Sequence, residues 1–375
     1  MTDRKKTGPK TGRRRFLGAL AAGGAAAATL ATPNVSRAQT VVLRFQSTWP
    51  QRDIFHEMAQ DYVNRVNQMS GGRLRLDLLA AGAIVGAFQL QDGVHAGAVD
   101  GGHGVAAYWY GKNKASSLFG TAPAFGWDAN ELLGWIHYGG GQDLYNEFLS
   151  SVLRVNVVSF FSGPMPTQPF GWFRQEIQGA EQMRGLRYRT VGLAADLYRE
   201  MGVAVTIVPG GEIVPAMDRG LLDAAEFNNP SSDRVLGFPD VSRIYYLQSY
   251  HQALECFEII FNKGRYDRLP NEQKAILKYA AEAASADMSW KAQDRYPKDL
   301  QEMRERQNVR AIKTPDSILQ AQLQAWNRVI EQLSADAFFK RVVDSQKAWA
   351  QRIVSFRREY EVSRDVAFNH FFPGR

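Results

Sequence analysis

Few residues in this 375-residue chain have the types and spacing that catalysis or tight metal binding requires. Its six histidines are scattered, and the closest pair, His95 and His103, is separated by a Gly-rich turn. The sequence contains no phosphate loop, dinucleotide-binding turn, serine nucleophile elbow, CxxC pair or zinc-protease motif. The one cysteine, Cys256, is expected to be a small buried residue. The sequence therefore predicts a binding protein and not an enzyme.

The positive charge of the chain is concentrated at its N-terminus. The formal net charge is +7, from 45 Lys and Arg against 38 Asp and Glu. Residues 1–38 hold eight of these bases and one of the acids, which leaves 37 of each in the rest. A chain without that segment is formally neutral, so a nucleic-acid partner is not expected.

Residues 1–38 have the three parts of an export signal. Basic residues come first, a weakly apolar run rich in Ala and Gly follows, and residues 36–38 (Ser-Arg-Ala) provide small side chains for a signal peptidase. Residues 13–17 (Arg-Arg-Arg-Phe-Leu) match the twin-arginine pattern, although Gly12 stands where Ser or Thr is usual. We expect cleavage after Ala38 and a mature protein in the periplasm. An amphipathic or disordered tail is the alternative.

Hydrophobic periodicity predicts strands that alternate with helices in two units of similar size. The first unit has strands at 41–45 and 73–78, helices at 53–69 and 88–97, and a turn at Asp100-Gly101-Gly102. The second has strands at 155–161, 186–190, 205–208 and 224–227, and helices at 193–201 and 212–219. This order is typical of α/β proteins with a parallel sheet flanked by helices.

The chain after Pro270 consists mostly of helix formers, from 271 to about 309 and again from 317 to 360. The second stretch would be about 66 Å long if unbroken, which exceeds one α/β unit, and residues 334–336 could divide it. No later segment predicts a membrane-spanning helix, because the longest uncharged stretch, 155–173, contains three prolines.

Four ordered blocks resemble the periplasmic solute-binding proteins of TRAP transporters. They are TQPFGWFR at 167–174 with MRGLRYR at 183–189, PGGEIVPA at 209–216, GLLDAAEF at 220–227, and FNK at 261–263 followed by Leu269-Pro270. The resemblance extends from about residue 41 to residue 360. Gln168 before Gly-Trp-Phe, and Glu226 before an aromatic residue, point to the branch that binds 2-oxo acids or lactate through a metal ion.

This resemblance implies an α/β, two-lobed periplasmic-binding-protein-like fold with a hinge, a ligand cleft between the lobes and long C-terminal helices. Residues 39–162 and about 249–310 would form the first lobe, 163–248 the second, and 315–375 a C-terminal helical region. The protein would capture a small 2-oxo or 2-hydroxy monocarboxylate with a metal cation and deliver it to the TRAP permease subunits. A dicarboxylate or sugar acid as ligand, or an exported metal-dependent enzyme, remain alternatives.

The same resemblance assigns individual residues to the ligand and the cation. Arg189 corresponds to the carboxylate-binding arginine of the family, and a guanidinium can meet two carboxylate oxygens at once. Glu226, Gln168 and the carbonyl of Phe227 correspond to metal-binding positions, and Gln252 aligns with a second acid of the family pattern. Oxygen donors of this kind suit Na⁺ or Ca²⁺, which would bridge Glu226 to the substrate oxygens.

Several of these residues keep a second interpretation. Glu226 could be a solvated acid at a strand end, and the amide of Gln168 could order a loop or contact the substrate. Tyr108, in a segment that resembles the contact region of the first lobe, could bond a substrate oxygen or pack in the core. Trp49 could likewise line the cleft or pack in the core. The C-terminal helix can exchange between subunits in the resembled branch, so a homodimer is possible beside a monomer with two packed helices.

The twin-arginine pattern predicts that export depends on Arg13 and Arg14. Replacing both by Lys keeps the charge but removes the paired guanidinium groups that the export machinery recognises. We expect unprocessed precursor to accumulate in the cytoplasm, as measured by cell fractionation and immunoblotting. Normal periplasmic accumulation of the double variant would contradict the assignment of the signal.

Overall fold

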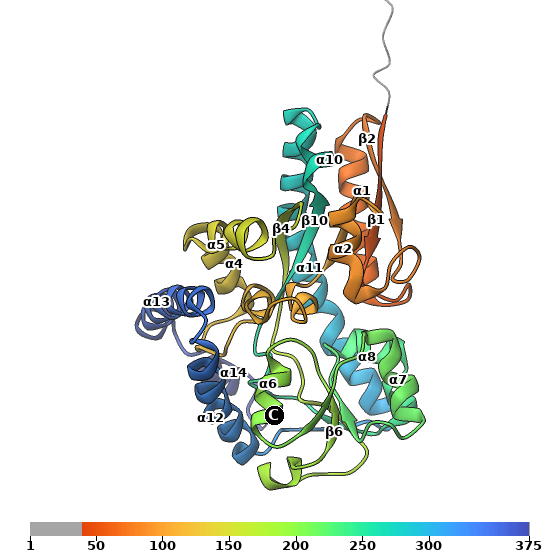
Figure 1. Ribbon diagram of the computed structural model, residues 1–375. Helices are drawn as coiled ribbons and strands as arrows, with labels where there is room; N and C mark the ends of the chain where they lie inside the picture. The colour runs from red at the N-terminus through yellow and green to blue at the C-terminus, as the bar shows by residue number, and fades with distance from the viewer. Residues whose placement is uncertain (1–39, 375) are drawn as a thin grey trace, which may run out of the picture. The chain divides into compact units, whose positions relative to one another are not determined.

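The computed structural model describes residues 40–374. The predicted export signal therefore lies outside the described residues. The strands form two mixed sheets (Figure 1). Sheet A has the order β2-β1-β3-β10-β4 and contains β1 (Val41–Ser47), β2 (Leu74–Leu79), β3 (Gly101–Gly104), β4 (Val157–Met165) and β10 (Glu255–Asn262). Sheet B has the order β11-β9-β5-β8-β6-β7 and contains β5 (Gly171–Phe173), β6 (Arg187–Arg189), β7 (Ala204–Thr206), β8 (Ala224–Ala225), β9 (Ile244–Tyr246) and β11 (Arg310–Ile312).

We call sheet A with the helices that follow its strands lobe A, and sheet B with its helices lobe B. The helices of lobe A are α1 (Ile54–Met69), α2 (Leu90–Ala96), α3 (Ser117–Gly120), α4 (Ala129–Tyr138), α5 (Gly141–Glu147) and α10 (Lys263–Asp267). Those of lobe B are α6 (Ala194–Glu200), α7 (Gly210–Asp218), α8 (Pro230–Leu236) and α9 (Phe238–Val241). The predicted α/β, two-lobed architecture is thus confirmed.

Parallel pairing is only part of each sheet. β1 pairs in parallel with β2 and β3, as the strand–helix alternation predicts. β10 was not predicted, and it lies antiparallel between β3 and β4 with every residue buried. Five of its eight residues are apolar and the polar ones, Glu255, Glu258 and Asn262, are buried as well, so the strand is covered on both faces.

The predicted turn at Asp100-Gly101-Gly102 is wrong, because Gly101 and Gly102 begin the central strand β3. A Cβ on Gly101 would come within 2.5 Å of the Phe261 ring, and one on Gly102 within 2.6 Å of the Gln46 carbonyl oxygen. These glycines therefore allow β3 to fit between its neighbours under α2, and they do not serve a turn.

The C-terminal region contains four helices, α11 (Asn271–Arg306), α12 (Asp316–Leu333), α13 (Ala337–Tyr360) and α14 (Arg364–Phe371). α11 packs against β4 and α1 in lobe A and against α8 in lobe B, so it joins the lobes (Figure 1). The second helical stretch is divided at residues 334–336, where the Asp336 carboxylate accepts a hydrogen bond from the Phe339 amide and caps α13. An unbroken 66 Å helix is therefore ruled out.

α12 packs against α6 of lobe B, and α13 packs against α4 and α5 of lobe A. The C-terminal helices thus cover both lobes from outside. Within residues 40–374, no helix has both the length and the apolar character that crossing a bilayer requires.

The tight packing of β3 predicts that Gly102→Ala is destabilising. The added methyl group would clash with the Gln46 carbonyl and with the Leu90 side chain, 2.7 Å away, and overpacking of this kind costs about 1–3 kcal/mol. Gly111→Ala is the matched control, because nothing lies within 4 Å of its Cβ position. Urea unfolding of both variants measures the difference. Equal unfolding midpoints would contradict the account of β3.

Candidate functional site

Two neighbouring strands of sheet B bring an arginine and a glutamate together. β6 and β8 run parallel, with Arg189 opposite Ala225, so their carboxyl ends lie at one edge of the sheet. The Glu226 amide donates to the Arg189 carbonyl at 3.3 Å. Ligands of such sheets bind beyond the carboxyl ends of the strands, which makes this edge the place to look for a site.

The Arg189 side chain is fully buried. Its Nε donates to the Val208 carbonyl at 2.9 Å, and its Nη1 donates to the Glu226 carbonyl at 2.9 Å and to Glu226 Oε1 at 3.1 Å. Its Nη2 has no hydrogen-bond partner among residues 40–374. Arg187, two residues earlier, has the opposite environment: it is half exposed and paired with Asp223. Residues two apart lie on the same face of a strand, so the difference comes from their positions along β6: Arg187 begins the strand and Arg189 ends it.

Three of the residues predicted for the site carry a buried side-chain oxygen without a partner. These oxygens are Glu226 Oε2, Gln168 Oε1 and Gln252 Oε1, for which the described part of the chain supplies no donor. Gln168 and Gln252 lie in neighbouring loops, because the backbone N–H of Gln168 donates a hydrogen bond to the backbone carbonyl of Gln252 at 3.1 Å. A buried polar atom without a partner costs free energy, so the pattern indicates a site for a group that binds oxygen.

Sequence reasoning missed Glu255, the first residue of β10. Its Oε2 accepts hydrogen bonds from Gln168 Nε2 at 3.0 Å and from Asn228 Nδ2, and the side chain is buried. Gln252, the residue predicted for the second acid, instead donates from Nε2 to the Val191 carbonyl at 3.4 Å. An acid at the start of a mostly apolar segment, three residues after Gln252, was the available signal.

Burial dominates the electrostatics of both glutamates. It raises the pKa of Glu226 to about 7, although the positive charge of Arg189 acts in the opposite direction. It raises the pKa of Glu255 to about 8, and the negative charge of Glu226 adds to this effect, whereas hydrogen bonds from Asn228 and Gln168 oppose it. Two acids within electrostatic range in a dry site favour a bound positive charge.

The described residues contain no group of three or more His, Cys, Asp and Glu side chains placed to hold a metal ion. A cation at this edge would therefore need amide or carbonyl oxygens beside the carboxylates. Gln168 and the Phe227 backbone offer such oxygens, and they suit Na⁺ or Ca²⁺ better than zinc.

Tyr108 approaches the site from lobe A, and Trp49 packs behind it. Tyr108 lies on the short 3-10 turn η2 (Ala106–Trp109), and the charges of Arg189, Glu255 and Glu226 all act on its hydroxyl. Trp49 packs against the Tyr108 ring at 5.6 Å, and its indole N–H donates to His103 Nδ1 at 2.7 Å. The Tyr108 hydroxyl therefore lies within electrostatic range of the charged groups of the site. The Trp49 indole instead points into the packed interior of lobe A.

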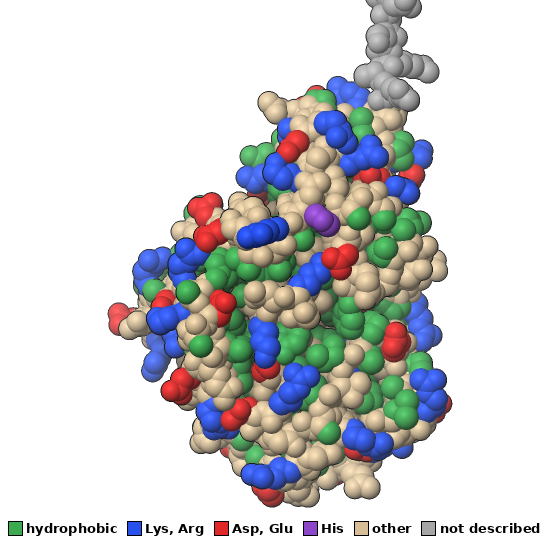
Figure 2. Space-filling view, in the orientation of Figure 1, with side chains coloured by type: hydrophobic (Ala, Val, Ile, Leu, Met, Phe, Trp, Pro, Cys, Tyr) green, Lys and Arg blue, Asp and Glu red, His purple; other side chains and the backbone are tan. Residues whose placement is uncertain are grey.

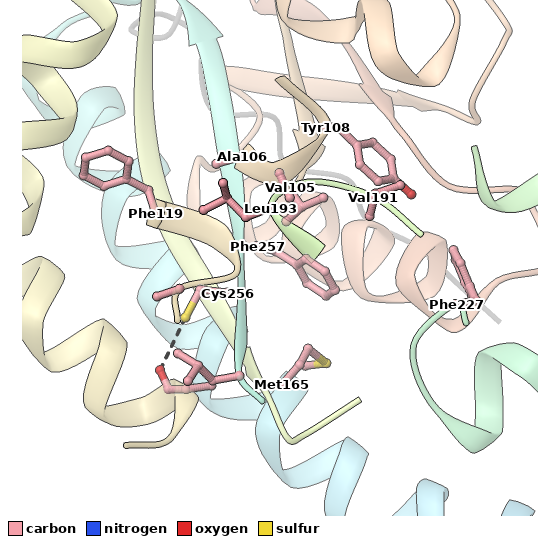
Figure 3. Close-up of a cluster of buried hydrophobic side chains, with 14 of the residues drawn as sticks. Val105, Ala106, Tyr108, Phe119, Met165, Val191, Leu193, Phe227, Cys256 and Phe257 are labelled. Carbon is pink, nitrogen blue, oxygen red and sulfur yellow. Dashed lines mark hydrogen bonds between the residues drawn. The ribbon is translucent and has the colours of Figure 1, made fainter. Parts of the chain in front are cut away.

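Aromatic and aliphatic side chains from both lobes enclose the space around Tyr108. Figure 3 shows Tyr108 and Phe257 of lobe A beside Val191 and Phe227 of lobe B, with Cys256 buried on the far side of β10. A cavity of about 310 Å³ adjoins them, lined by side chains that include Phe88, Tyr110 and Ile207 together with Tyr108 and Val191. Figure 2 shows hydrophobic side chains gathered where the surfaces of the two lobes meet.

Residues 45–339 match the bacterial extracellular solute-binding protein family 7 (DctP). The chain belongs to this family. The monocarboxylate 2-oxoacid-binding periplasmic protein of Nostoc sp. is 32% identical to it over 355 residues, which cover 90% of this chain and 95% of that protein. The predicted resemblance to solute-binding proteins of TRAP transporters is thereby confirmed.

Solved structures agree with this family. A TRAP transporter solute-binding protein of Bordetella bronchiseptica, with copurified calcium and picolinate, has a TM-score of 0.83 at 27% identity and covers 89% of this chain and 97% of its own. A second, from Pseudoalteromonas atlantica with bound sodium and pyruvate, has a TM-score of 0.81 at 28% identity and covers 89% and 100%. The Nostoc and Pseudoalteromonas relatives are both periplasmic binding proteins.

The raised pKa of Glu255 predicts how stability depends on pH. Unfolding returns this carboxyl to an ordinary pKa of 4.5, so between about pH 4.5 and 8 the folded protein holds a proton that the unfolded chain has lost. This contribution is fully present below the unfolded pKa and is lost as the pH rises through the folded pKa. The unfolding free energy falls by up to about 1.4 kcal/mol for each pH unit of rise in this window.

Glu255→Gln should remove that part of the slope, and Glu282→Gln, an exposed acid on α11, should leave it unchanged. Urea unfolding between about pH 5 and 9, in potassium buffer with a calcium chelator, measures the three slopes. The same slope in wild type and Glu255→Gln would contradict the burial of a protonated carboxyl.

Proposed function

We propose that this protein captures a small 2-oxo or 2-hydroxy monocarboxylate, such as pyruvate or lactate, together with Na⁺ or Ca²⁺. It is exported by the twin-arginine route and delivers the acid to TRAP permease subunits. The observation that carries the proposal is the buried Arg189, whose Nη2 has no hydrogen-bond partner within the described residues. One side-chain oxygen of Glu226 and one of Gln168 are likewise buried without a partner there. The pyruvate-bound relative with sodium supports this ligand class.

Arg189 would hold the ligand carboxylate, because a guanidinium offers a planar pair of donors that match two carboxylate oxygens. Glu226, the Phe227 carbonyl and Gln168 would hold the cation, with Glu255 or Gln252 completing its coordination. The cation would then contact the oxygen on the second carbon of the ligand and screen the negative charges from one another. No residue in this scheme carries out a reaction.

Tyr108 would donate its hydroxyl to a ligand oxygen, since burial raises its pKa and keeps the proton on it. The apolar residues beside it, including Phe227 and Val191, would face the rest of the ligand (Figure 3). Such surroundings favour a monocarboxylate with a modest apolar tail over a dicarboxylate or sugar acid, whose second polar end would lose its hydration.

The C-terminal end supports the further proposal of a homodimer. Large apolar side chains on the end of α13 and on α14 are exposed, namely Phe356, Tyr360, Val366, Phe368 and Phe371. Exposed apolar patches of this kind commonly mark protein interfaces. Light scattering coupled to size exclusion should show a dimer for the mature protein and a monomer for the variant Phe368→Ser/Phe371→Ser. A monomeric wild type at micromolar concentration would contradict the dimer.

The proposed role of Arg189 predicts a large loss of affinity in Arg189→Ala. Removing the guanidinium leaves the buried carboxylate without its main partner, which costs about 3 kcal/mol or more, on the order of a hundredfold in Kd. Arg189→Lys should recover only part of the affinity, because an ammonium group cannot grip two oxygens in one plane. Isothermal titration of pyruvate in calcium-containing buffer measures these values.

Arg187→Ala is the matched control, because Arg187 lies on the same strand with its side chain half exposed. We expect its Kd for pyruvate to stay within about threefold of the wild-type value. If Arg187→Ala were the damaging change and Arg189→Ala the mild one, the proposed ligand contact would be wrong.

A further inference from the structure

Asp53 is a buried acid outside the candidate ligand site. It precedes α1 in lobe A, and its Oδ1 accepts a hydrogen bond from the Phe55 amide at 3.2 Å, which caps the helix. The same oxygen accepts a bond from Ser232 Oγ at 2.6 Å. Ser232 belongs to α8 of lobe B, so this hydrogen bond crosses from one lobe to the other.

A chain of buried side chains connects this bond to the candidate site. Glu255 accepts from Asn228 Nδ2, and Asn228 Oδ1 accepts from Asn229 Nδ2 at 3.0 Å. Asn229 Nδ2 also lies 3.2 Å from Ser232 Oγ, which in turn donates to Asp53. All five residues are at most 5% exposed, so water does not compete for these bonds.

Asn229 also fixes the start of α8. Asn229 caps the helix by accepting from the amides of Ser231 and Ser232 at 3.0 and 2.9 Å. At the other end of α8, the Leu236 carbonyl accepts from Arg52 Nη2 at 3.0 Å. Arg52 and Asp53 of lobe A therefore contact both ends of one helix of lobe B, and the first of those ends leads back to Glu255.

We propose that Asp53 is a positioning residue for ligand capture: its bond to Ser232 holds the lobes together, and the Asn228–Asn229 pair links that bond to the position of Glu255. The inference rests on the proposed function, because it treats Glu255 as part of the ligand site. A ligand or cation that fixes Glu255 also fixes Asn228 and the start of α8, and so strengthens the contact between the lobes. Conversely, loss of the contact speeds ligand release.

Ser232→Ala removes the bond between the lobes and keeps the Asp53 cap on α1. Ser231→Ala is its matched control, because Ser231 is the buried neighbour in the same helical turn, and its Oγ bonds Asp299 of α11 instead of Asp53. In stopped-flow measurements with pyruvate and calcium, we expect Ser232→Ala to raise the dissociation rate three- to tenfold and Ser231→Ala to leave it within twofold. Both variants should lower the unfolding midpoint of the ligand-free protein by similar amounts.

A double-mutant cycle separates the bond from the helix cap. Asp53→Ser keeps a hydroxyl that can cap α1 but is too short to reach Ser232. If the bond carries the effect, Asp53→Ser/Ser232→Ala should dissociate no faster than the more affected single variant. Asp53→Asn, whose amide oxygen can still accept both bonds, should restore most of the wild-type rate. Strictly additive effects, or equal rates in Ser231→Ala and Ser232→Ala, would overturn the proposal.

A second readout keeps the test independent of ligand identity. Spin labels at Gln60 on α1 and Asp218 on α7, both exposed, report the distance between the lobes, and Cys256 is buried away from the label. We expect Ser232→Ala, but not Ser231→Ala, to shift the distances to larger values. If wild type failed to bind pyruvate, the proposed function would fail, and this shift would still decide the role of Asp53. An unchanged distance distribution would contradict it.

Discussion

The structure depends on the placement of charged groups in a dry interior. Arg189 and Glu226 form an ion pair in which both side chains are fully buried, and a third ionisable group, Glu255, is buried nearby. Removing such groups from water in their charged forms costs several kcal/mol each, and an ion pair beside a second ionised acid would carry a net negative charge. A bound cation and a carboxylate ligand together would balance the charges of the site. Their binding would also provide partners for buried polar atoms that have none within the described residues.

The surrounding architecture keeps these groups in register. The parallel pairing of β6 and β8 aligns Arg189 with Glu226, while β10 of the other sheet supplies Glu255. The site is therefore complete only when both sheets are in contact. α11 packs on both lobes and α8 bonds to lobe A through Asp53, so the same contacts that bury the charges also join the lobes. Under the proposed scheme, ligand binding and contact between the lobes would be parts of one physical event.

Local patterns in the sequence were sufficient for most elements of the fold. Helix α1, the alternating strand β2 and the break before α13 follow from periodicity and from capping residues such as Asp53 and Asp336. β3 was mistaken for a turn because Gly is the usual turn residue, and only its neighbours in space show why Gly101 and Gly102 are needed in a strand. β10 was not predicted because its polar residues, Glu255, Glu258 and Asn262, are buried with the apolar ones and do not alternate with them.

The candidate site shows the same limit. Arg189, Glu226 and Gln168 were predicted because they belong to family blocks, but alternation on β6 does not distinguish Arg189 from Arg187, which lies two residues earlier on the same face. Glu255 was missed because it pairs with Gln168 and Asn228 across 87 and 27 residues of sequence, a proximity that no local pattern encodes. The chain of hydrogen bonds from Glu255 to Asp53 spans an even larger separation in sequence, since the bond between Ser232 and Asp53 joins residues 179 positions apart.

The central claim is that a cation completes the buried site and makes binding of the acid possible. The most direct measurement is calorimetric titration of pyruvate into mature protein that has been freed of Na⁺ and Ca²⁺ by chelation and exchange into choline buffer, with and without added cation. The account predicts little or no binding in cation-free buffer and full recovery on addition of Ca²⁺ or Na⁺. Equal affinity in both buffers would show that the acid binds to Arg189 without a cation and would contradict the account.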